Sequence, residues 1–292
     1  MRPGDAPGTA GTPGQAESRA GTPGQAEGRA GTPGQAESRA GTPGQAESRA
    51  GTPGQAEGRA GTPGRAQAPA QAGTPGAGGP PSPTADQLAQ LARLGSATVY
   101  EAGGRGAFVD ADLIQVLPGS RAAGPARTVL CGQDDNLMVH AAMDGLKPGE
   151  VLVLTMPNPR PVALVGELLA TQAKARGAAA MLVDASVRDV EELRELGLPV
   201  WARWVRVRGA TKDVPGSIGE PVSVGGAEIR QGDVVVLDAD GAAIVAAERV
   251  EQILAASLDR EQREQAKRER LAAGELSYDL DGLRARVQGA SR

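Results

Sequence analysis

A tandem repeat near the N-terminus limits what this part of the chain can fold into. From Ala10 the chain repeats AGTPGQAESR or AGTPGQAEGR to about Arg59, and altered copies continue to about Gly79. The units hold Gly and Pro but no Val, Leu, Ile or aromatic residue. They therefore cannot bury enough apolar surface to offset the entropy lost on ordering a backbone. We expect residues 1–83 to be a disordered Gly/Pro-rich tail, with a semi-rigid spacer or a partner-binding tail as the alternative.

The pattern changes at Thr84, where we expect the folded domain, residues 84–292, to begin. Apolar runs of strand length occur at 113–117, 127–131, 151–155, 180–184, 199–204, 234–238 and 242–246. Helical spacing occurs at 86–94, 136–144, 162–176, 189–196 and 248–272, with short helices at 96–101, capped by Ser96, and from Leu280. Alternating strands and helices are typical of parallel βαβ units, whereas turns at Gly225-Gly226 and Gly241 predict later hairpins. The sequence thus predicts an α/β fold with a single mixed-sheet domain, preceded by a disordered repeat tail.

Composition excludes several kinds of partner. The formal net charge is −4 and aromatic residues are 2%, so the chain has neither a basic field nor stacking platforms for nucleic acid. Cys131 is the only cysteine, which excludes an intrachain disulfide and Cys-rich zinc clusters. We expect no membrane partner, because no stretch of 18 apolar residues is present. An N-terminus without an apolar segment predicts a cytoplasmic protein.

Residues 164–204 are the stretch that says most about function. Their pattern predicts a helix, a strand, a tight loop, a second helix and a second strand. Gly166 and Glu167 open the first helix, and Arg188 and Asp189 lie at the start of the second. The N-termini of both helices would then flank one pocket at the carboxyl ends of the strands. The free backbone N–H groups at these helix starts suit a ligand with a carboxylate group. Asp189 offers a hard oxygen ligand for Mg²⁺ or Mn²⁺, and Arg188 offers a fixed cation. From these local features alone, an exposed ion pair at the start of a helix is the simpler interpretation.

A longer pattern resembles a known family. Glu167, twenty intervening residues and then Arg188-Asp189 resemble the acidic-x20-Arg-Asp signature of the class II pyruvate aldolases. These enzymes act on 4-hydroxy-4-methyl-2-oxoglutarate and 4-carboxy-4-hydroxy-2-oxoadipate, and their superfamily includes the regulator of ribonuclease activity A. Further segments that resemble the family lie at 135–154, 166–177, 208–226, 231–245 and 267–284. The resemblance covers about 86–288 and implies a swivelling β/β/α fold.

This resemblance implies retro-aldol cleavage to pyruvate and a second oxo acid, either pyruvate or oxaloacetate, with accompanying oxaloacetate decarboxylation. Asp189 would bind Mg²⁺ or Mn²⁺, and Arg188 would hold the C2 oxygen of the 2-oxo acid and stabilise a pyruvate enolate. The helix start at Gly166 would bind the pyruvyl carboxylate through the backbone N–H groups of Glu167, Leu168 and Leu169.

The family resemblance also implies two roles for glutamates. The Glu167 carboxylate would orient a metal-bound water that acts as the base, although some family members carry Asp at this position. Glu264 resembles a glutamate that reaches into the site of a neighbouring subunit, which implies a homotrimer or a homohexamer.

Other interpretations remain open at this stage. The chain can also be a non-catalytic protein-binding regulator of ribonuclease activity, or an oxaloacetate decarboxylase whose aldolase activity is incidental. His140, the only histidine, fits a packing or surface role, and Cys131 fits a small core residue better than a nucleophile. Surface charge is the simplest role for the four lysines of the folded part. These are Lys147, Lys174, Lys267 and Lys212, the last of which lies in a glycine-rich loop that resembles the family.

Overall fold

The computed structural model describes residues 82–289, so the predicted disordered tail lies almost entirely outside the described residues. Thr84 caps helix α1 (Ala85–Leu94): its hydroxyl accepts a hydrogen bond from Gln87 N at 3.2 Å, and the Gln87 side chain accepts one from Thr84 N at 2.8 Å. This reciprocal capping box pairs N–H groups that a first helical turn leaves free. The first helix therefore starts where the sequence pattern changes.

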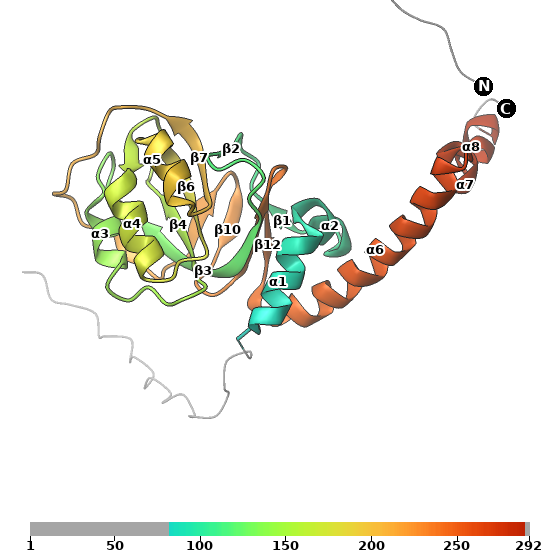
Figure 1. Cartoon of the computed structure of the whole chain (residues 1–292), viewed down its shortest axis with the longest axis horizontal. Helices are drawn as coiled ribbons and strands as arrows, with labels where there is room; N and C mark the ends of the chain where they lie inside the picture. The colour runs from blue at the N-terminus through green and yellow to red at the C-terminus, as the bar shows by residue number, and fades with distance from the viewer. Residues whose placement is uncertain (1–81, 290–292) are drawn as a thin grey trace, which may run out of the picture. The chain divides into compact units, whose positions relative to one another are not determined.

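One large mixed sheet forms the centre of the domain (Figure 1). Its main path runs β1-β12-β11-β3-β4-β6-β7-β2, with β5 paired to β6 and β8 paired to β3. The strands of this sheet are β1 (Ala107–Phe108), β2 (Ile114–Gln115), β3 (Ala122–Leu130), β4 (Val151–Thr155), β5 (Ala163–Val165), β6 (Ala180–Val187), β7 (Val200–Val205), β8 (Ser217–Ile218), β11 (Val234–Asp238) and β12 (Gly241–Val245). Strands β3, β4, β6 and β7 are parallel, whereas β11 and β12 are antiparallel. The predicted single mixed sheet is confirmed.

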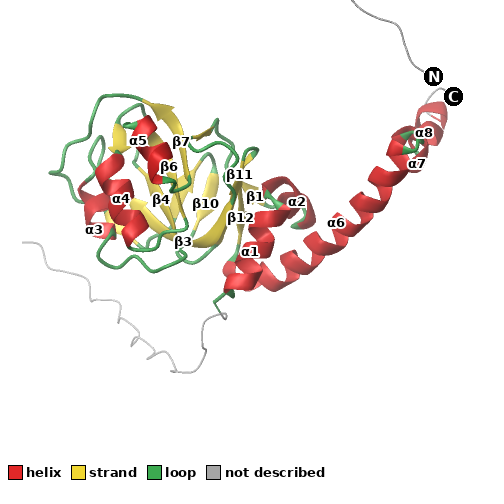
Figure 2. Ribbon diagram, viewed as in Figure 1, coloured by secondary structure: helices red, strands yellow, loops and turns green. Residues whose placement is uncertain are grey.

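Both faces of the parallel strands are buried, which their continuous apolar sequences require. In β4, Leu152 and Leu154 pack under α3, α4 and α5, while Val151 and Val153 pack on the other face against a small hairpin. The three covering helices are α3 (Leu137–Ala142), α4 (Glu167–Ala175) and α5 (Val190–Leu196), seen in Figure 2. The hairpin is formed by β9 (Val222–Val224) and β10 (Ala227–Ile229) around the predicted Gly225-Gly226 turn.

A separate helical layer covers the antiparallel strands β11 and β12. Helix α1, α2 (Ser96–Ala102) and the first half of α6 (Val250–Ala272) share one apolar cluster with β11 and β12. The turn η1 (Ala247–Arg249) leads from β12 into α6. Two ion pairs add to this contact: Arg93 with Glu261 at 2.5 Å, and Arg260 with Glu101 at 3.9 Å.

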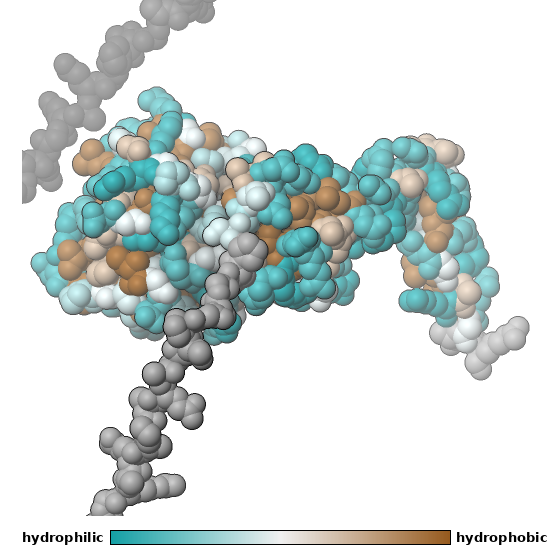
Figure 3. All heavy atoms as spheres, turned by 90° about the horizontal axis from the view of Figure 1, so that it is seen from below, coloured by the Kyte–Doolittle hydropathy of each residue, from teal (hydrophilic) through white to brown (hydrophobic). Residues whose placement is uncertain are grey.

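Beyond these contacts α6 extends away from the sheet, and two short helices follow it, α7 (Ser277–Leu280) and α8 (Leu283–Gly289) (Figure 1). Its surface is largely hydrophilic, and hydrophobic residues reappear towards the C-terminal end (Figure 3). In this part of the chain, Leu271, Leu276 and Leu283 are exposed apolar side chains. Within the described residues, no helix combines the length and the apolar character that a membrane span requires.

Two local predictions were wrong, and two short strands were missed. Residues 163–165 form strand β5 rather than the start of a helix, because this fully buried apolar segment has no amphipathic period to distinguish the two. Ser96 does not cap α2; its N–H and hydroxyl instead donate to the buried Asp238 carboxylate at 2.9 and 2.6 Å. Strands β1 and β8 were missed because two residues are too short to show a pattern.

Candidate active site

The candidate site lies at the carboxyl ends of β5 and β6. These strands are parallel, with Val165 beside Val187, so the residues that follow each strand meet at one edge of the sheet. Gly166 and Glu167 follow β5 and begin α4, while Arg188 and Asp189 follow β6 and begin α5. The Arg188 N–H donates to the Val165 carbonyl at 3.1 Å and holds the two loops together. The predicted pairing of two helix starts around one hollow is therefore present.

Asp189 has an unusual conformation and an unexpected partner. Its backbone is left-handed (φ 59°, ψ 49°), and its side chain caps no N–H of its own helix α5. Instead, Asp189 Oδ2 accepts a hydrogen bond from the Glu167 N–H at 3.1 Å, and so caps the neighbouring helix α4. Arg188 Nε lies 3.6 Å from the same oxygen. One carboxylate thus joins the starts of both helices.

Two glycines make room for this arrangement. A Cβ on Gly166 would lie 2.4 Å from Asp189 Oδ2 and 3.1 Å from Arg188 Nε. A Cβ on Gly209 would lie 2.8 Å from Arg188 Nη1. Because real Cβ atoms do not approach other atoms to 2.8 Å or less, a side chain at position 166 would displace the Asp189 carboxylate, and one at position 209 would displace the Arg188 guanidinium.

These residues line a pocket of about 180 Å³. The wall includes Gly166, Leu168 and Leu169 from the start of α4, beside Arg188 and Asp189. The first N–H groups of a helix have no partner within the helix. Since Asp189 occupies the Glu167 N–H, the N–H groups of Leu168 and Leu169 are the ones available to an anion. The side chain of Leu168 itself is 82% exposed at the rim.

The loop at 208–216 forms another wall and is held by a buried carboxylate. Asp135 Oδ2 accepts hydrogen bonds from Thr211 Oγ1 at 2.6 Å and from the N–H groups of Asp213 at 2.6 Å and Val214 at 3.1 Å. Burial raises the pKa of Asp135, but the hydrogen bonds from Thr211, from the two loop N–H groups and from the N–H of Leu137 outweigh it and lower the pKa to about 2. Asp135 therefore stays ionised and fixes the backbone on both sides of Lys212.

Among the residues that line the pocket, the structure adds three polar ones that sequence reasoning had not assigned to a site. His140 and Lys212 both line it, although surface or packing roles were the simpler predictions. Burial, and then the charge of Lys212, lower the pKa of His140, which keeps this imidazole neutral near pH 7. Asn136 also lines the pocket; its Nδ2 donates to the Leu164 carbonyl at 2.9 Å, while its buried Oδ1 has no partner. These three residues share one pocket because the 208–216 loop folds back onto α3. No local sequence pattern predicts that contact.

The two glutamates that were predicted to take part in catalysis, Glu167 and Glu264, do not line the pocket. Glu167 Oε1 accepts a hydrogen bond from Thr171 Oγ1 at 2.7 Å, so its carboxylate lies along α4 rather than among the pocket-lining groups. Glu264 lies on α6 and pairs with Arg260 at 2.7 Å. Within one chain, the structure does not bring Glu264 together with Arg188 and Asp189.

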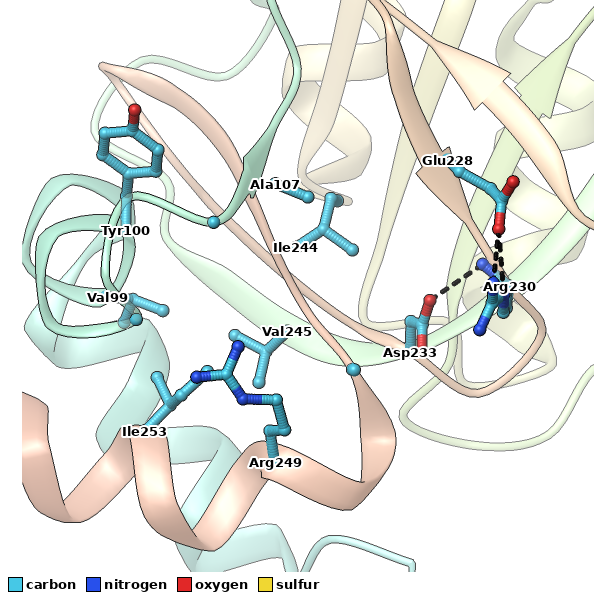
Figure 4. Close-up of a pocket in the computed structure, with 13 residues that line it drawn as sticks. Val99, Tyr100, Ala107, Glu228, Arg230, Asp233, Ile244, Val245, Arg249 and Ile253 are labelled. Atoms are coloured by element: carbon cyan, nitrogen blue, oxygen red, sulfur yellow. Dashed lines mark hydrogen bonds and ion pairs between the residues drawn. The ribbon is translucent and has the colours of Figure 1, made fainter.

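A second hollow of about 220 Å³ lies between α2, β12 and the start of α6 (Figure 4). Three of its charged groups have polar partners: Arg230 pairs with Glu228 at 2.8 Å, and Asp233 accepts hydrogen bonds from the backbone N–H groups of Arg230 and Ala247. Arg249, Val245 and Ile253 all line this hollow and are drawn in Figure 4. This hollow contains none of the predicted site residues.

Two buried groups have structural roles. Cys131 is 1% exposed, and burial raises the pKa of its thiol to about 12, as expected for a core residue and not for a nucleophile. Asp184 in β6 accepts hydrogen bonds from Thr155 Oγ1 at 2.9 Å and Arg203 at 3.1 Å. Burial raises the pKa of Asp184 in spite of these partners.

Comparison with solved structures first defines the class of fold. An uncharacterised protein from Pseudomonas syringae pv. tomato matches 70% of this chain and 96% of its own, with a TM-score of 0.62 and 19% identity, which shows a shared fold alone. RraAS2 of Streptomyces coelicolor, described as an unusual member of the RNase ES inhibitor RraA protein family, matches 64% of this chain and 99% of its own. Its TM-score is 0.58 and its identity 30%. The domain therefore has the RraA type of α/β fold.

Sequence comparison then gives the family. The family model described as "RraA-like: Aldolase/RraA" matches residues 95–244, and the chain belongs to this family. A relative named "Putative 4-hydroxy-4-methyl-2-oxoglutarate aldolase" from Halalkalibacterium halodurans is 36% identical over 131 residues. The match covers 45% of this chain and 62% of the relative, so the chain spans less than two thirds of the length of that protein.

Proposed function

We propose that this protein cleaves 4-hydroxy-2-oxo acids by a retro-aldol reaction that releases pyruvate, with 4-hydroxy-4-methyl-2-oxoglutarate or 4-carboxy-4-hydroxy-2-oxoadipate as substrate. Oxaloacetate decarboxylation at the same site belongs to this proposal, since it gives the same enolate. The observation that carries the proposal is the grouping of Arg188, Asp189 and the free N–H groups at the start of α4 in one pocket. The name of the 36% identical relative supports the same chemistry.

Each group has a part in the proposed reaction. The N–H groups of Leu168 and Leu169 bind the pyruvyl carboxylate at the positive end of the α4 dipole. The Arg188 guanidinium donates to the C2 oxygen and stabilises the negative charge that forms there as the C3–C4 bond breaks. The C4 hydroxyl proton must leave in the same step. Glu167 can assist this transfer only after its carboxylate leaves Thr171, so we propose a change of its rotamer when substrate binds.

The donor set fits a divalent cation held by a single protein carboxylate. No group of three His, Cys, Asp or Glu side chains converges within the described part of the chain. Asp189 nevertheless presents a side chain that is 40% exposed at the pocket, and Mg²⁺ is usually bound by one or two carboxylates together with water and substrate oxygens. When bound there, Mg²⁺ or Mn²⁺ supplies a Lewis acid that draws charge onto the C2 oxygen.

The experiment measures pyruvate release from a panel of 4-hydroxy-2-oxo acids and from oxaloacetate, with and without Mg²⁺. We expect release that a chelator abolishes. Asp189→Asn should lower it by at least about a hundredfold, because the charge that holds the cation is lost at nearly constant shape, and excess Mg²⁺ should not restore it. Asp112→Asn, which removes an exposed carboxylate outside the pocket, serves as the control. Full activity of Asp189→Asn would rule the proposed centre out.

A protein-binding role is the second candidate, and the match to RraAS2 favours it. A regulator would inhibit a ribonuclease without needing the pocket. Inhibition that persists in Asp189→Asn, combined with no pyruvate release by the wild type, would support this function over the aldolase.

We also propose that the working form is a homotrimer, or a homohexamer, in which Glu264 reaches a neighbouring subunit's site. Exposed apolar side chains support an interface: Leu168 at the pocket rim is 82% exposed, Val207 before the 208–216 loop 92%, and Leu276 after α6 58%. Such side chains are typical of surfaces that another subunit covers.

A further inference from the structure

The hollow between α2, β12 and the start of α6 (Figure 4) shares no lining residue with the pocket at Arg188 and Asp189. Its volume is about 220 Å³. A water molecule takes up about 30 Å³ of liquid, so the hollow has room for roughly seven to ten non-hydrogen atoms. Apolar side chains form much of its wall: Val99, Ile244, Val245 and Ile253. A small ligand with an apolar part therefore fits both the size and the lining.

Arg249 brings an unpaired cation into this hollow. Its side chain forms no ion pair within residues 82–289, and its Nε donates only to Gln252 Oε1, at the long distance of 3.5 Å. Glu248 and Glu251, close to it in the chain, are exposed and do not line the hollow. Arg249 also precedes α6 directly, where the helix dipole is positive and a cation is unfavourable. Its position therefore favours an anionic group on a ligand.

The wall also holds a carboxylate that no cation neutralises. Glu228 pairs with Arg230 at 2.8 Å. Asp233 is 9% exposed and accepts backbone N–H groups of Arg230 and Ala247 at 2.9 and 3.3 Å, but it forms no ion pair within the described part of the chain. Dashed lines in Figure 4 join Arg230 to Glu228 and Asp233, and none reaches Arg249. The lining charges sum to zero, with one cation and one carboxylate left apart.

We propose that this hollow is a second ligand site, which binds an aliphatic α-amino acid. Arg249 donates to the carboxylate of the ligand, Asp233 accepts from its ammonium, and its branched side chain packs on Ile244 and Ile253. A zwitterion supplies a partner to both unpaired charges and leaves the lining neutral, whereas a carboxylate alone would leave Asp233 without a cation. Leucine, with about nine non-hydrogen atoms, matches the size of the hollow. This site takes no part in the proposed aldolase chemistry.

The test measures binding of L-leucine to the full chain by calorimetric titration. We expect a Kd of about 1 mM or tighter, which a ligand of about nine non-hydrogen atoms can reach. The melting temperature should rise with leucine concentration, because the ligand binds the folded state. Two analogues test the ligand class: 4-methylpentanoate lacks the ammonium, and 3-methylbutylamine lacks the carboxylate. Each should bind at least about tenfold more weakly, since one charge-assisted hydrogen bond is lost.

Variants locate the site. Arg249→Gln should weaken leucine binding at least about tenfold, and Arg249→Lys should retain part of it because the charge remains. Ala107→Trp places a large ring at an exposed position of the wall and should abolish binding by filling the hollow. Two controls should bind leucine as the wild type does: Arg176→Gln, at an exposed arginine outside both hollows, and Asp189→Asn, in the candidate active site. The melting temperature of each variant without leucine verifies its fold.

Three results would overturn the proposal. If the wild type binds no leucine at about 10 mM, roughly ten times the expected Kd, the hollow is not an amino-acid site. Binding that Arg249→Gln and Ala107→Trp leave unchanged, or that Asp189→Asn abolishes, would place the ligand elsewhere. If 4-methylpentanoate binds as tightly as leucine, Asp233 contacts no ammonium and the ligand class is wrong.

Discussion

Gly166 is the residue at which one added methyl group would disturb the candidate site most directly. Its φ of −130° is ordinary for any residue, so alanine is compatible with the backbone there. The added Cβ would nevertheless lie 2.4 Å from Asp189 Oδ2, and the carboxylate would have to move. We expect Gly166→Ala to lower kcat/KM for pyruvate release at least about tenfold, which corresponds to about 1.4 kcal/mol of transition-state stabilisation.

Gly106→Ala is the matched control for this prediction. It adds the same methyl group at an exposed glycine whose new Cβ would approach only the Gly103 carbonyl oxygen, at 3.7 Å. Its activity and melting temperature should match the wild type. Equal activity of the two variants would show that Asp189 need not stay where the structure places it.

At the residue scale, the sequence predicted the residues at the two helix starts but not the side chains that other parts of the chain bring to the same pocket. Arg188 and Asp189 are adjacent, and their position after an apolar strand predicts exposure at a strand end. His140 and Lys212 lie more than seventy residues apart, on a helix and a loop. They meet because Asp135 hydrogen-bonds the 208–216 loop, and a buried aspartate is not distinguishable in the sequence from an exposed one.

At the scale of elements, one buried carboxylate, that of Asp135, accepts three hydrogen bonds from the 208–216 loop. Asn at position 135 would present an amide NH₂ where at least one loop N–H now donates, so Asp135→Asn should lower the free energy of unfolding by about 2 kcal/mol. The pKa of Asp135 is lowered from 3.8 to about 2 in the folded state. This carboxylate therefore stabilises the fold above pH 3.8, and the contribution disappears as pH falls to about 2.

Denaturant unfolding at several pH values tests this prediction. The difference in stability between the wild type and Asp135→Asn should be largest at neutral pH and should shrink as pH falls to about 2. Asp112→Asn, at an exposed position, controls for loss of a charge. A difference that is constant across pH would mean that the Asp135 carboxylate does not hold the loop.

The sequence predicted the helices and strands whose hydrophobic patterns extend over many residues. The alternation of strands and helices predicted the parallel strands, and Gly225-Gly226 predicted the β9–β10 hairpin, because a glycine pair permits the positive φ angles found there. Strand β5 was not predicted, since a three-residue segment buried on all sides carries no periodicity. The β5–β6 pairing places both halves of the site together, so the sequence predicted that the two helix starts meet but not the strand pairing that brings them together.

At the scale of the whole molecule, the proposed shared site predicts that two impaired variants regain activity when they are mixed. Arg188→Ala should be nearly inactive, and Glu264→Gln should be reduced. The two variants are unfolded together and refolded in equal amounts. If they form a head-to-tail ring, about a quarter of the sites would combine an intact Arg188 from one chain with an intact Glu264 from the next. Activity should then exceed the mean of the two variants refolded separately.

Native mass spectrometry of the mixture verifies that mixed oligomers form. Mixed oligomers without any gain in activity would place Glu264 in the site of its own chain or outside the reaction. Its pairing with Arg260 at 2.7 Å would then be its main role.

The hydrogen bond from the Glu167 N–H to Asp189 has a consequence for observing the protein at work. Asp189 Oδ2 serves the start of α4 in the structure, whereas the proposed cation would draw on the same carboxylate. Any change in what Asp189 binds should therefore alter the surroundings of the Glu167 amide proton. In an NMR spectrum, the Glu167 amide would act as a built-in reporter: its chemical shift and its exchange with solvent should follow the filling of the pocket, in the absence of any turnover.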